Sequence, residues 1–165
     1  MTSKALTLAA LLLGVATIAQ AAPAIVRTGA PIAPIAATVG VPAGSDIVYL
    51  SGMLPPVADP NAPPGTPAAY GDTTTQTVNL FKHMQAVLAE KGLTLGDVVM
   101  MRIYMVGDPA KDGHMDFAGM MAGYKQFFGT PDQPNKPARS TVQVAGLAAP
   151  GQAMEIEVTA ARAPK

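Results

Sequence analysis

One cation and two carboxylates near the C-terminal end of the 165-residue chain have the types and spacing for chemistry on a small acid. Arg139 stands where one alternating run begins, and Glu155 and Glu157 lie two residues apart in a second run. Alternation of period two is typical of a half-buried strand, so the two carboxylates share one face. A guanidinium donates paired hydrogen bonds to a carboxylate, and a carboxylate can orient or deprotonate a water. The stretch therefore predicts a site that holds a small carboxylic acid beside a water.

Two strands and a connecting loop must position these groups. The strands are expected over residues 140–145 and 154–159, and residues 146–152 between them carry two glycines and a proline, which are typical of a loop. We expect the second strand to return beside the first and bring its carboxylates to Arg139. The apolar positions that should face the core are Val142 and Val144 in the first strand and Met154, Ile156 and Val158 in the second.

Two helices are predicted before this stretch. Residues 72–91 have apolar side chains at helical spacing, with Asp72 or Thr73 as the N-cap and Gly92 just after the end. Residues 116–128 form the second helix, which Asp116 can cap, and its broad apolar face holds half of the aromatic residues. Both helices need a sheet on which to bury these faces.

Further strands complete that sheet. Residues 47–52 and 98–106 are rich in β-branched and other apolar residues and read as buried strands. Residues 22–36, rich in alanine, proline and isoleucine, are expected to run as a linker and then an edge strand that residues 38–41 continue. Residues 55–71 hold six prolines and are expected to be loop throughout. That loop is either a lid over the site or a surface insert.

Composition excludes several classes of function. The formal net charge is zero, which gives no electrostatic footprint for nucleic acid or anionic lipid. Cysteine is absent, so neither a disulfide nor a thiol nucleophile is possible. His83 and His114 are far apart and lack metal-ligand spacing, so we expect no metal and no cofactor.

The N-terminus has the pattern of a secretory signal peptide. Lys4 precedes the apolar run of residues 5–18, and Ala19-Gln20-Ala21 supplies a small-x-small cleavage pattern. Cleavage after Ala21 would leave 165 − 21 = 144 residues, one domain, in the periplasm or outside the cell with no membrane segment. An uncleaved membrane anchor is the alternative.

The C-terminal stretch also resembles a known family. Pro137-Ala138-Arg139-Ser140, followed by a loop with Pro150 and by Glu155-Ile156-Glu157, is similar to the C-terminal signature of the RidA (YjgF) family. Ser51-Gly52 at a strand end and the segment 92–99 also match. The resemblance covers roughly residues 30–162, which implies an extended N-terminal segment at 22–32 and a single domain at 33–165.

The resemblance implies an architecture and an activity. The element order indicates an α+β protein, a mixed β-sheet with two helices packed on one face, and the family implies the YjgF/chorismate-mutase-like fold. It implies a homotrimer with sites between subunits. The implied reaction is hydrolysis of reactive 2-imino acids or enamines to 2-oxo acids and ammonia. Arg139 would bind the substrate carboxylate, Glu155 would act on the water, and Ser51 and Gly52 would line the pocket, with Glu157 structural.

Three positions differ from the commonest family members. Ile35 stands at the place of a pocket tyrosine, Met121 at that of an asparagine, and Thr141 at that of a cysteine. These three are therefore expected to line a more apolar substrate-binding pocket, with a changed substrate preference.

Other functions stay open at this point. The protein could be a non-catalytic trimer that binds a small carboxylate or other proteins, and Arg139 could instead serve an ion pair at a strand or subunit boundary. Isomerisation of the chorismate-mutase type is disfavoured, because its dianionic substrate needs several cations and only Arg139 is placed convincingly.

Overall fold

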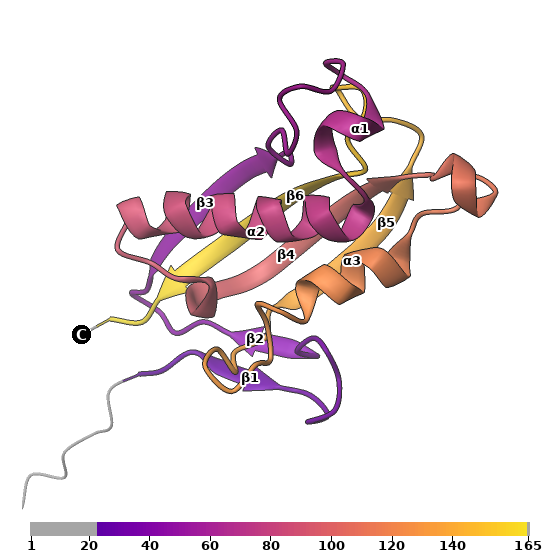
Figure 1. Ribbon diagram of the computed structural model, residues 1–165. Helices are drawn as coiled ribbons and strands as arrows, with labels where there is room; N and C mark the ends of the chain where they lie inside the picture. Colours follow the sequence, from indigo (N-terminus) through magenta and orange to yellow (C-terminus); the bar gives the residue numbers. More distant parts are fainter. Residues whose placement is uncertain (1–22, 165) are drawn as a thin grey trace, which may run out of the picture.

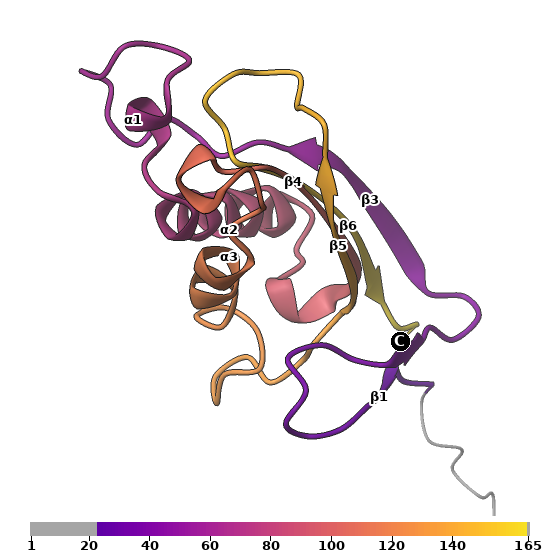
Figure 2. The same ribbon diagram turned by 90° about the vertical axis from the view of Figure 1, so that its right-hand side faces the viewer.

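The computed structural model describes residues 23–164, which form one curved mixed sheet with helices on one face and a small two-stranded sheet beside it. Figure 1 shows the two main helices crossing in front of the sheet, and Figure 2 shows that its other face carries no helix. The α+β class, with a mixed sheet and two helices packed on one face, is confirmed. The helix-free side is called the open face below.

The main sheet has the strand order β3-β6-β4-β5. β4 and β5 run parallel, whereas β6 is antiparallel to both β3 and β4. The strand bounds are β3 (Asp46–Met53), β4 (Val98–Val106), β5 (Ala138–Val144) and β6 (Met154–Arg162).

The expected return of the second C-terminal strand beside the first is wrong. β5 and β6 do not pair, because β4 lies between them. Met101 of β4 is opposite Arg139 of β5 on one side and Val158 of β6 on the other. The loop after β5 therefore passes over the end of β4, and β6 takes the centre of the sheet, where both of its edges are paired.

The helices begin where the caps predict. α2 (Thr73–Glu90) follows Asp72, whose carboxylate accepts from the Thr75 amide at 2.7 Å, and the chain leaves it through Gly92 at a φ of 64°. α3 (Phe117–Tyr124) follows Asp116, which accepts from the Gly119 amide at 3.1 Å. The predicted end at residue 128 is wrong, since α3 ends at Tyr124 and a turn carries residues 125–128.

The core lies between these helices and one face of the central strands. β6 alternates as predicted, and in both β4 and β6 nearly every second side chain is buried. The rings of Tyr124 in α3 and of Phe127 and Phe128 in the turn after it pack edge-on or tilted against Phe81 of α2, with centroid distances of 5.3–6.0 Å. The fully buried side chains include Leu80, Phe81, Met84, Leu88, Met101, Ile103, Met105, Met120, Tyr124, Met154 and Ile156.

β5 presents the face opposite to the expected one. Arg139 and Thr141 are level with Met101 and Ile103, so these polar side chains face the helices. Val142 is level with Tyr104 on the open face and is 46% exposed. An alternating sequence shows that the two faces of a strand differ in polarity, but it does not show which face packs against the core. The polar face of β5 is directed toward α3.

The N-terminal segment forms a hairpin instead of a continued edge strand. β1 (Val26–Thr28) pairs antiparallel with β2 (Thr38–Gly40), so the chain reverses between them. Arg27 donates to the Gly96 carbonyl at 2.9 Å, which docks this hairpin below the sheet. Figure 1 shows the pair beneath the start of β5.

The proline-rich segment is not loop throughout. It contains α1 (Pro67–Tyr70), which begins with proline at its first position, where a missing amide costs nothing. The carbonyl of buried Ala69 accepts from the amides of Ala58 and Asp59 at 2.7 and 3.0 Å. Two 3-10 turns, η1 (Leu95–Asp97) and η2 (Pro109–Lys111), flank β4.

Within residues 23–164, none of the helices has the length and apolar character needed to cross a bilayer. The expected signal peptide, residues 1–21, lies outside the described residues.

The cap of α2 gives a stability prediction. Asp72→Ala removes the acceptor for the first-turn amides and should lower the free energy of unfolding by about 1 kcal/mol, whereas Asp72→Asn keeps an acceptor and should cost less. Thermal unfolding of the two variants checks this difference. Equal losses would show that the Asp72 side chain does not cap the helix.

The same cap predicts a pH dependence. Hydrogen bonds from the Thr75 amide lower the pKa of Asp72 below its usual value. Its stabilising contribution should therefore be complete above the ordinary aspartate pKa and be lost as pH falls through the lowered one. Urea unfolding at neutral and acidic pH should show a smaller acid-induced loss in Asp72→Asn than in the wild type. An identical loss would contradict the assignment.

Candidate functional site

Arg139 lies on the helix side of β5, against α3. Its Nη2 atom is 3.3 Å from the sulfur of Met121, and its guanidinium carbon is 4.3 Å from the centre of the Tyr124 ring. The Phe117 ring is 6.0 Å away. These three residues have the spacing i, i+4 and i+7 on α3, so one helix face holds the guanidinium against its aromatic rings.

The guanidinium has no carboxylate partner among the described residues. Its Nη1 atom is buried and makes no hydrogen bond there, and the same holds for the hydroxyl of Thr141, two residues along the same face of β5. Burial lowers the pKa of Arg139 from its usual value, although an arginine stays charged. Two neighbouring buried donors thus lack an acceptor, and a bound carboxylate would supply it.

Two hydrogen bonds tie the loop of residues 34–36 to this group, and one of them comes from Tyr124. Its hydroxyl donates to the Pro34 carbonyl at 3.1 Å, and the Ala36 amide donates to the Pro137 carbonyl at 3.0 Å. Burial raises the pKa of Tyr124 to about 12, so the phenol remains a neutral donor. These bonds hold the loop that carries Ile35, which is half-buried, beside the start of β5.

Ser51, Gly52 and Glu155 form a second group, on the open face. Leu50 and Met53 of β3 are opposite Val158 and Ile156 of β6, so the two residues between them oppose one, a β-bulge. A Cβ atom on Gly52 would overlap the Glu155 carboxylate. Glycine at this position therefore lets the carboxylate lie directly over the β3 backbone.

Glu157, two residues further along the same face, is engaged within the sheet. Its Oε1 atom accepts from the Tyr104 hydroxyl at 2.7 Å and pairs with Arg102 at 3.2 Å. The hydrogen bond to Glu157 raises the pKa of Tyr104. These contacts fit the structural role expected for Glu157.

The two groups do not meet within one chain. Arg139, Thr141, Met121 and Ile35 gather on the helix side, whereas Ser51, Gly52 and Glu155 lie on the open face near the other edge of the sheet. The sheet itself separates the guanidinium from the carboxylate. A single site that uses both needs two copies of the chain.

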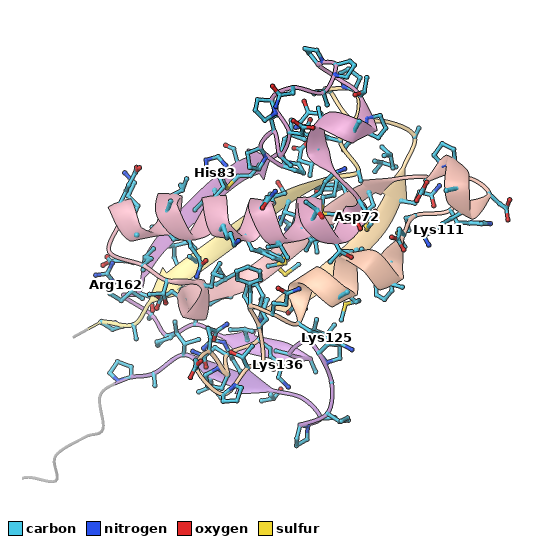
Figure 3. The ribbon with its side chains drawn as sticks, viewed as in Figure 1. Asp72, His83, Lys111, Lys125, Lys136 and Arg162 are labelled. Carbon is cyan, nitrogen blue, oxygen red and sulfur yellow. The ribbon has the colours of Figure 1, made fainter. Side chains whose placement is uncertain are left out.

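The part of the chain that the structure describes holds no group of three or more acidic or histidine side chains placed to bind a metal ion. His114 is exposed in the turn before α3, and His83 lies on the outer side of α2, as Figure 3 shows for the latter.

Gly52 gives a direct test of the open-face group. Gly52→Ala should displace the Glu155 carboxylate while the fold persists, and any activity that uses Glu155 should fall at least about tenfold. Turnover measured together with circular dichroism checks this. Full activity in a folded Gly52→Ala variant would show that the close approach of Glu155 to Gly52 has no functional importance.

The chain matches a family model described as Endoribonuclease L-PSP over residues 28–162. A RutC family protein of Haemophilus influenzae is 32% identical over 117 residues, which is 71% of this chain and 80% of the relative. The chain belongs to the RidA (YjgF) family. A Salmonella typhimurium relative named 2-iminobutanoate/2-iminopropanoate deaminase is 34% identical over 123 residues, 74% of this chain and 84% of its own.

Solved structures of the RidA family share the fold. A Yersinia pestis protein of the Rid family, YyfB, aligns with a TM-score of 0.59 and 25% identity over 78% of this chain and 87% of its own. Escherichia coli TdcF, solved with bound serine, aligns with a TM-score of 0.56 and 31% identity over 75% and 86%. Membership in the RidA family, expected from the residue pattern, is confirmed.

Sequence reasoning missed Phe117 and Tyr124 as neighbours of Arg139. Both belong to the broad apolar face expected of the helix over residues 116–128, and Tyr124 is fully buried. Their spacing with Met121 was a usable signal, because residues at i, i+4 and i+7 share one face. No local sequence pattern indicates that this face of α3 contacts β5.

Proposed function

We propose that this protein hydrolyses 2-imino acids and their enamine tautomers to 2-oxo acids and ammonia. Water adds to the imine carbon, the resulting carbinolamine loses its C–N bond, and the nitrogen leaves as ammonia with the protons that water supplied. No redox partner is needed. The Salmonella relative bears the name of such a deaminase.

The observation that carries this proposal is the unpaired guanidinium of Arg139. A buried cation is normally paired, and an isolated one is costly. Here Nη1 of Arg139 and the hydroxyl of Thr141 lie buried on the same face, and residues 23–164 supply no acceptor for either. A substrate carboxylate would accept from both, and the planar guanidinium would fix its orientation.

Glu155 is the group for the second half of the reaction. A carboxylate can deprotonate water as it adds to the imine carbon and return the proton to the leaving nitrogen. Glu155 makes no ion pair within the described residues and lies over the exposed Ser51-Gly52 bulge, whose backbone can help to hold the substrate nitrogen. Glu157, already paired, is less suited to this role.

The proposed assembly is a homotrimer with its sites between subunits. Because Arg139 and Glu155 lie on opposite sides of the sheet, the guanidinium of one subunit has to meet the carboxylate of its neighbour. The open face has apolar side chains to bury in such contacts, with Tyr49 at 78%, Val142 at 46% and Ile47 at 40% exposure. RidA family members are typically oligomeric, in agreement with this arrangement.

The lining of the proposed site favours apolar substrates. Met121 contacts the guanidinium through sulfur, and Ile35 stands on the loop held by Tyr124. Neither side chain offers a strong hydrogen-bonding group to a polar substrate side chain. We therefore expect imino acids with apolar side chains to be used better than small polar ones.

Export is part of the proposal. The charged start, apolar run and Ala19-Gln20-Ala21 pattern support cleavage after residue 21 and a periplasmic or secreted enzyme. N-terminal sequencing of the protein recovered from the extracytoplasmic fraction would test it. A protein retained in the cytoplasm with its N-terminus intact would refute it.

The primary experiment measures the release of ammonia and 2-oxo acid from freshly generated 2-imino acids of graded side-chain size. Imines hydrolyse spontaneously, so the quantity of interest is the acceleration by the mature protein over buffer. A clear acceleration supports the deaminase. A folded oligomeric protein without acceleration on any of these substrates would refute it.

A non-catalytic carboxylate-binding protein is the second candidate. The contact of Met121 with the Arg139 guanidinium favours it, because a thioether holds the cation in place without assisting water. Isothermal titration with 2-oxobutanoate separates the two candidates. Binding that depends on Arg139, without acceleration of imine hydrolysis, would establish the binding protein.

A further inference from the structure

Met121 has a sulfur that contacts a cation. The sulfur accepts a hydrogen bond from Nη2 of Arg139 at 3.3 Å. The other methionine sulfur that accepts one within residues 23–164 is that of Met154, from the Thr77 hydroxyl at 3.4 Å, and Met154 is fully buried. The chain has no cysteine, so methionine is its readily oxidised sulfur residue. Oxidation of the Met121 sulfur would therefore act directly on the guanidinium.

Burial decides which methionines a dissolved oxidant can reach. The fully buried methionines are Met84, Met101, Met105, Met120 and Met154. The half-buried ones are Met53, Met100, Met115 and Met121. Figure 1 shows α3, which carries Met121, beside β5, the strand at the edge of the sheet. A site that admits a substrate carboxylate to Arg139 also admits hydrogen peroxide, because hydrogen peroxide is smaller than any imino acid.

A peroxide oxidises a thioether by two electrons. The sulfur lone pair attacks one peroxide oxygen, the O–O bond breaks as the S–O bond forms, and the second oxygen leaves as water with both peroxide protons. The product is methionine sulfoxide, whose oxygen accepts hydrogen bonds far better than the weakly accepting thioether sulfur. On Met121 this oxygen would be attached to an atom that already lies 3.3 Å from Nη2 of Arg139.

The oxidised side chain would compete with a substrate for the guanidinium. None of the ion pairs among the described residues involves Arg139, so the sulfoxide oxygen has no carboxylate rival there. Methionine has three rotatable side-chain bonds, so the sulfur can shift and place its oxygen against the guanidinium. A hydrogen bond donated by a charged arginine is among the stronger ones. An acceptor supplied by α3 itself would exclude a substrate carboxylate from the same donors.

We propose that Met121 is a modification site, at which oxidation to the sulfoxide closes the anion site at Arg139 and reduction reopens it. The oxidant is a peroxide. The reductant is a dithiol acting through methionine sulfoxide reductases, which remove the sulfoxide oxygen as water while the dithiol becomes a disulfide. The proposal rests on Arg139 as the carboxylate anchor of the proposed function, and it applies to the deaminase and to the binding protein alike.

The site of oxidation can be read from one tryptic peptide of the mature protein. Peptide 112–125 carries Met115, Met120 and Met121. After brief treatment of the folded protein with hydrogen peroxide, tandem mass spectrometry should find the sulfoxide at half-buried Met115 and Met121, and not at fully buried Met120. An unmodified Met121 in protein whose Met115 is oxidised would overturn the proposal.

The effect on the site is measured by isothermal titration with 2-oxobutanoate and by ammonia release from 2-imino acids, before and after peroxide. Oxidation should weaken binding and lower kcat/KM about tenfold or more, and the two epimer-specific sulfoxide reductases with dithiothreitol should restore both. Met115→Leu is the matched control and should keep this sensitivity. Met121→Leu should lose it, with equal values before and after treatment. An equal effect of peroxide on Met121→Leu and on the wild type would contradict the proposal.

A third readout separates failure of this proposal from failure of the proposed function. Phenylglyoxal modifies accessible guanidinium groups, and its adduct on half-buried Arg139 blocks tryptic cleavage there. Oxidation should reduce the labelling of Arg139 severalfold in the wild type and not in Met121→Leu, independently of any ligand. Unchanged labelling in the oxidised wild type would refute the closure of the site. Native protein that neither binds 2-oxobutanoate nor accelerates imine hydrolysis would refute the proposed function alone.

Discussion

Arg139→Ala is expected to reduce kcat/KM for imine hydrolysis by about 10²–10³-fold, because two charge-assisted hydrogen bonds to the substrate carboxylate are lost. The half-buried guanidinium is held against the rings of Tyr124 and Phe117 by α3, so it is positioned before substrate arrives. Arg139→Lys keeps the charge but cannot donate in the same planar geometry, and most of the loss should remain. Ammonia release under steady-state conditions measures both variants.

Arg162→Ala is the matched control for this prediction. Arg162 ends β6, donates to the Lys91 carbonyl at 3.0 Å and lies far from α3, as Figure 3 shows. Its loss should leave kcat/KM near the wild-type value. If Arg139→Ala remained folded and retained wild-type kcat/KM, Arg139 would be a structural residue and the proposed anchor would be wrong.

Glu155→Gln is expected to lower kcat by about 10²–10⁴-fold, because a neutral amide cannot accept the proton of the attacking water. The change keeps size and shape, so the side chain can still lie over Gly52. KM should change little, since the carboxylate of the substrate is held by Arg139. Initial rates at saturating and limiting imino acid separate the two parameters.

Glu157→Gln is the control on the same strand and face. Glu157 is bound by Tyr104 and Arg102, and an amide oxygen can still accept these hydrogen bonds. Its kcat should stay within a few-fold of the wild type. Equal losses in Glu155→Gln and Glu157→Gln would indicate a general disturbance of the sheet and would contradict a catalytic role for Glu155.

Much of the fold follows from local sequence signals. The N-caps Asp72 and Asp116 fix the starts of both helices, and Gly92 supplies the left-handed residue after α2. Strand β6 has apolar side chains at alternating positions because one side of it is buried, whereas β4 is apolar at almost every position. These signals concern near neighbours in the chain, and for this reason they can be read without a structure.

The arrangement of the site could not be read in this way. β4 lies between β5 and β6 and pairs with both, although it is distant from them in the sequence. The residues of the loop that joins β5 to β6 carry no local signal for this arrangement. The orientation of β5 was predicted the wrong way round, since Val142 is apolar yet lies on the open face. An apolar residue on a solvent-facing sheet surface fits the proposed contact between subunits, which the pattern of one chain does not reveal.

The proposed site is formed by Arg139 of one subunit and Glu155 of its neighbour. The most direct test mixes Arg139→Ala and Glu155→Gln subunits, unfolds them and lets them reassemble. In a cyclic trimer every mixed assembly contains one site with both native residues, so an equal mixture should recover about a quarter of wild-type activity. Each inactive parent treated alone should recover none. If wild-type protein survives the same treatment but the mixture stays inactive, Arg139 and Glu155 do not share a site across the interface.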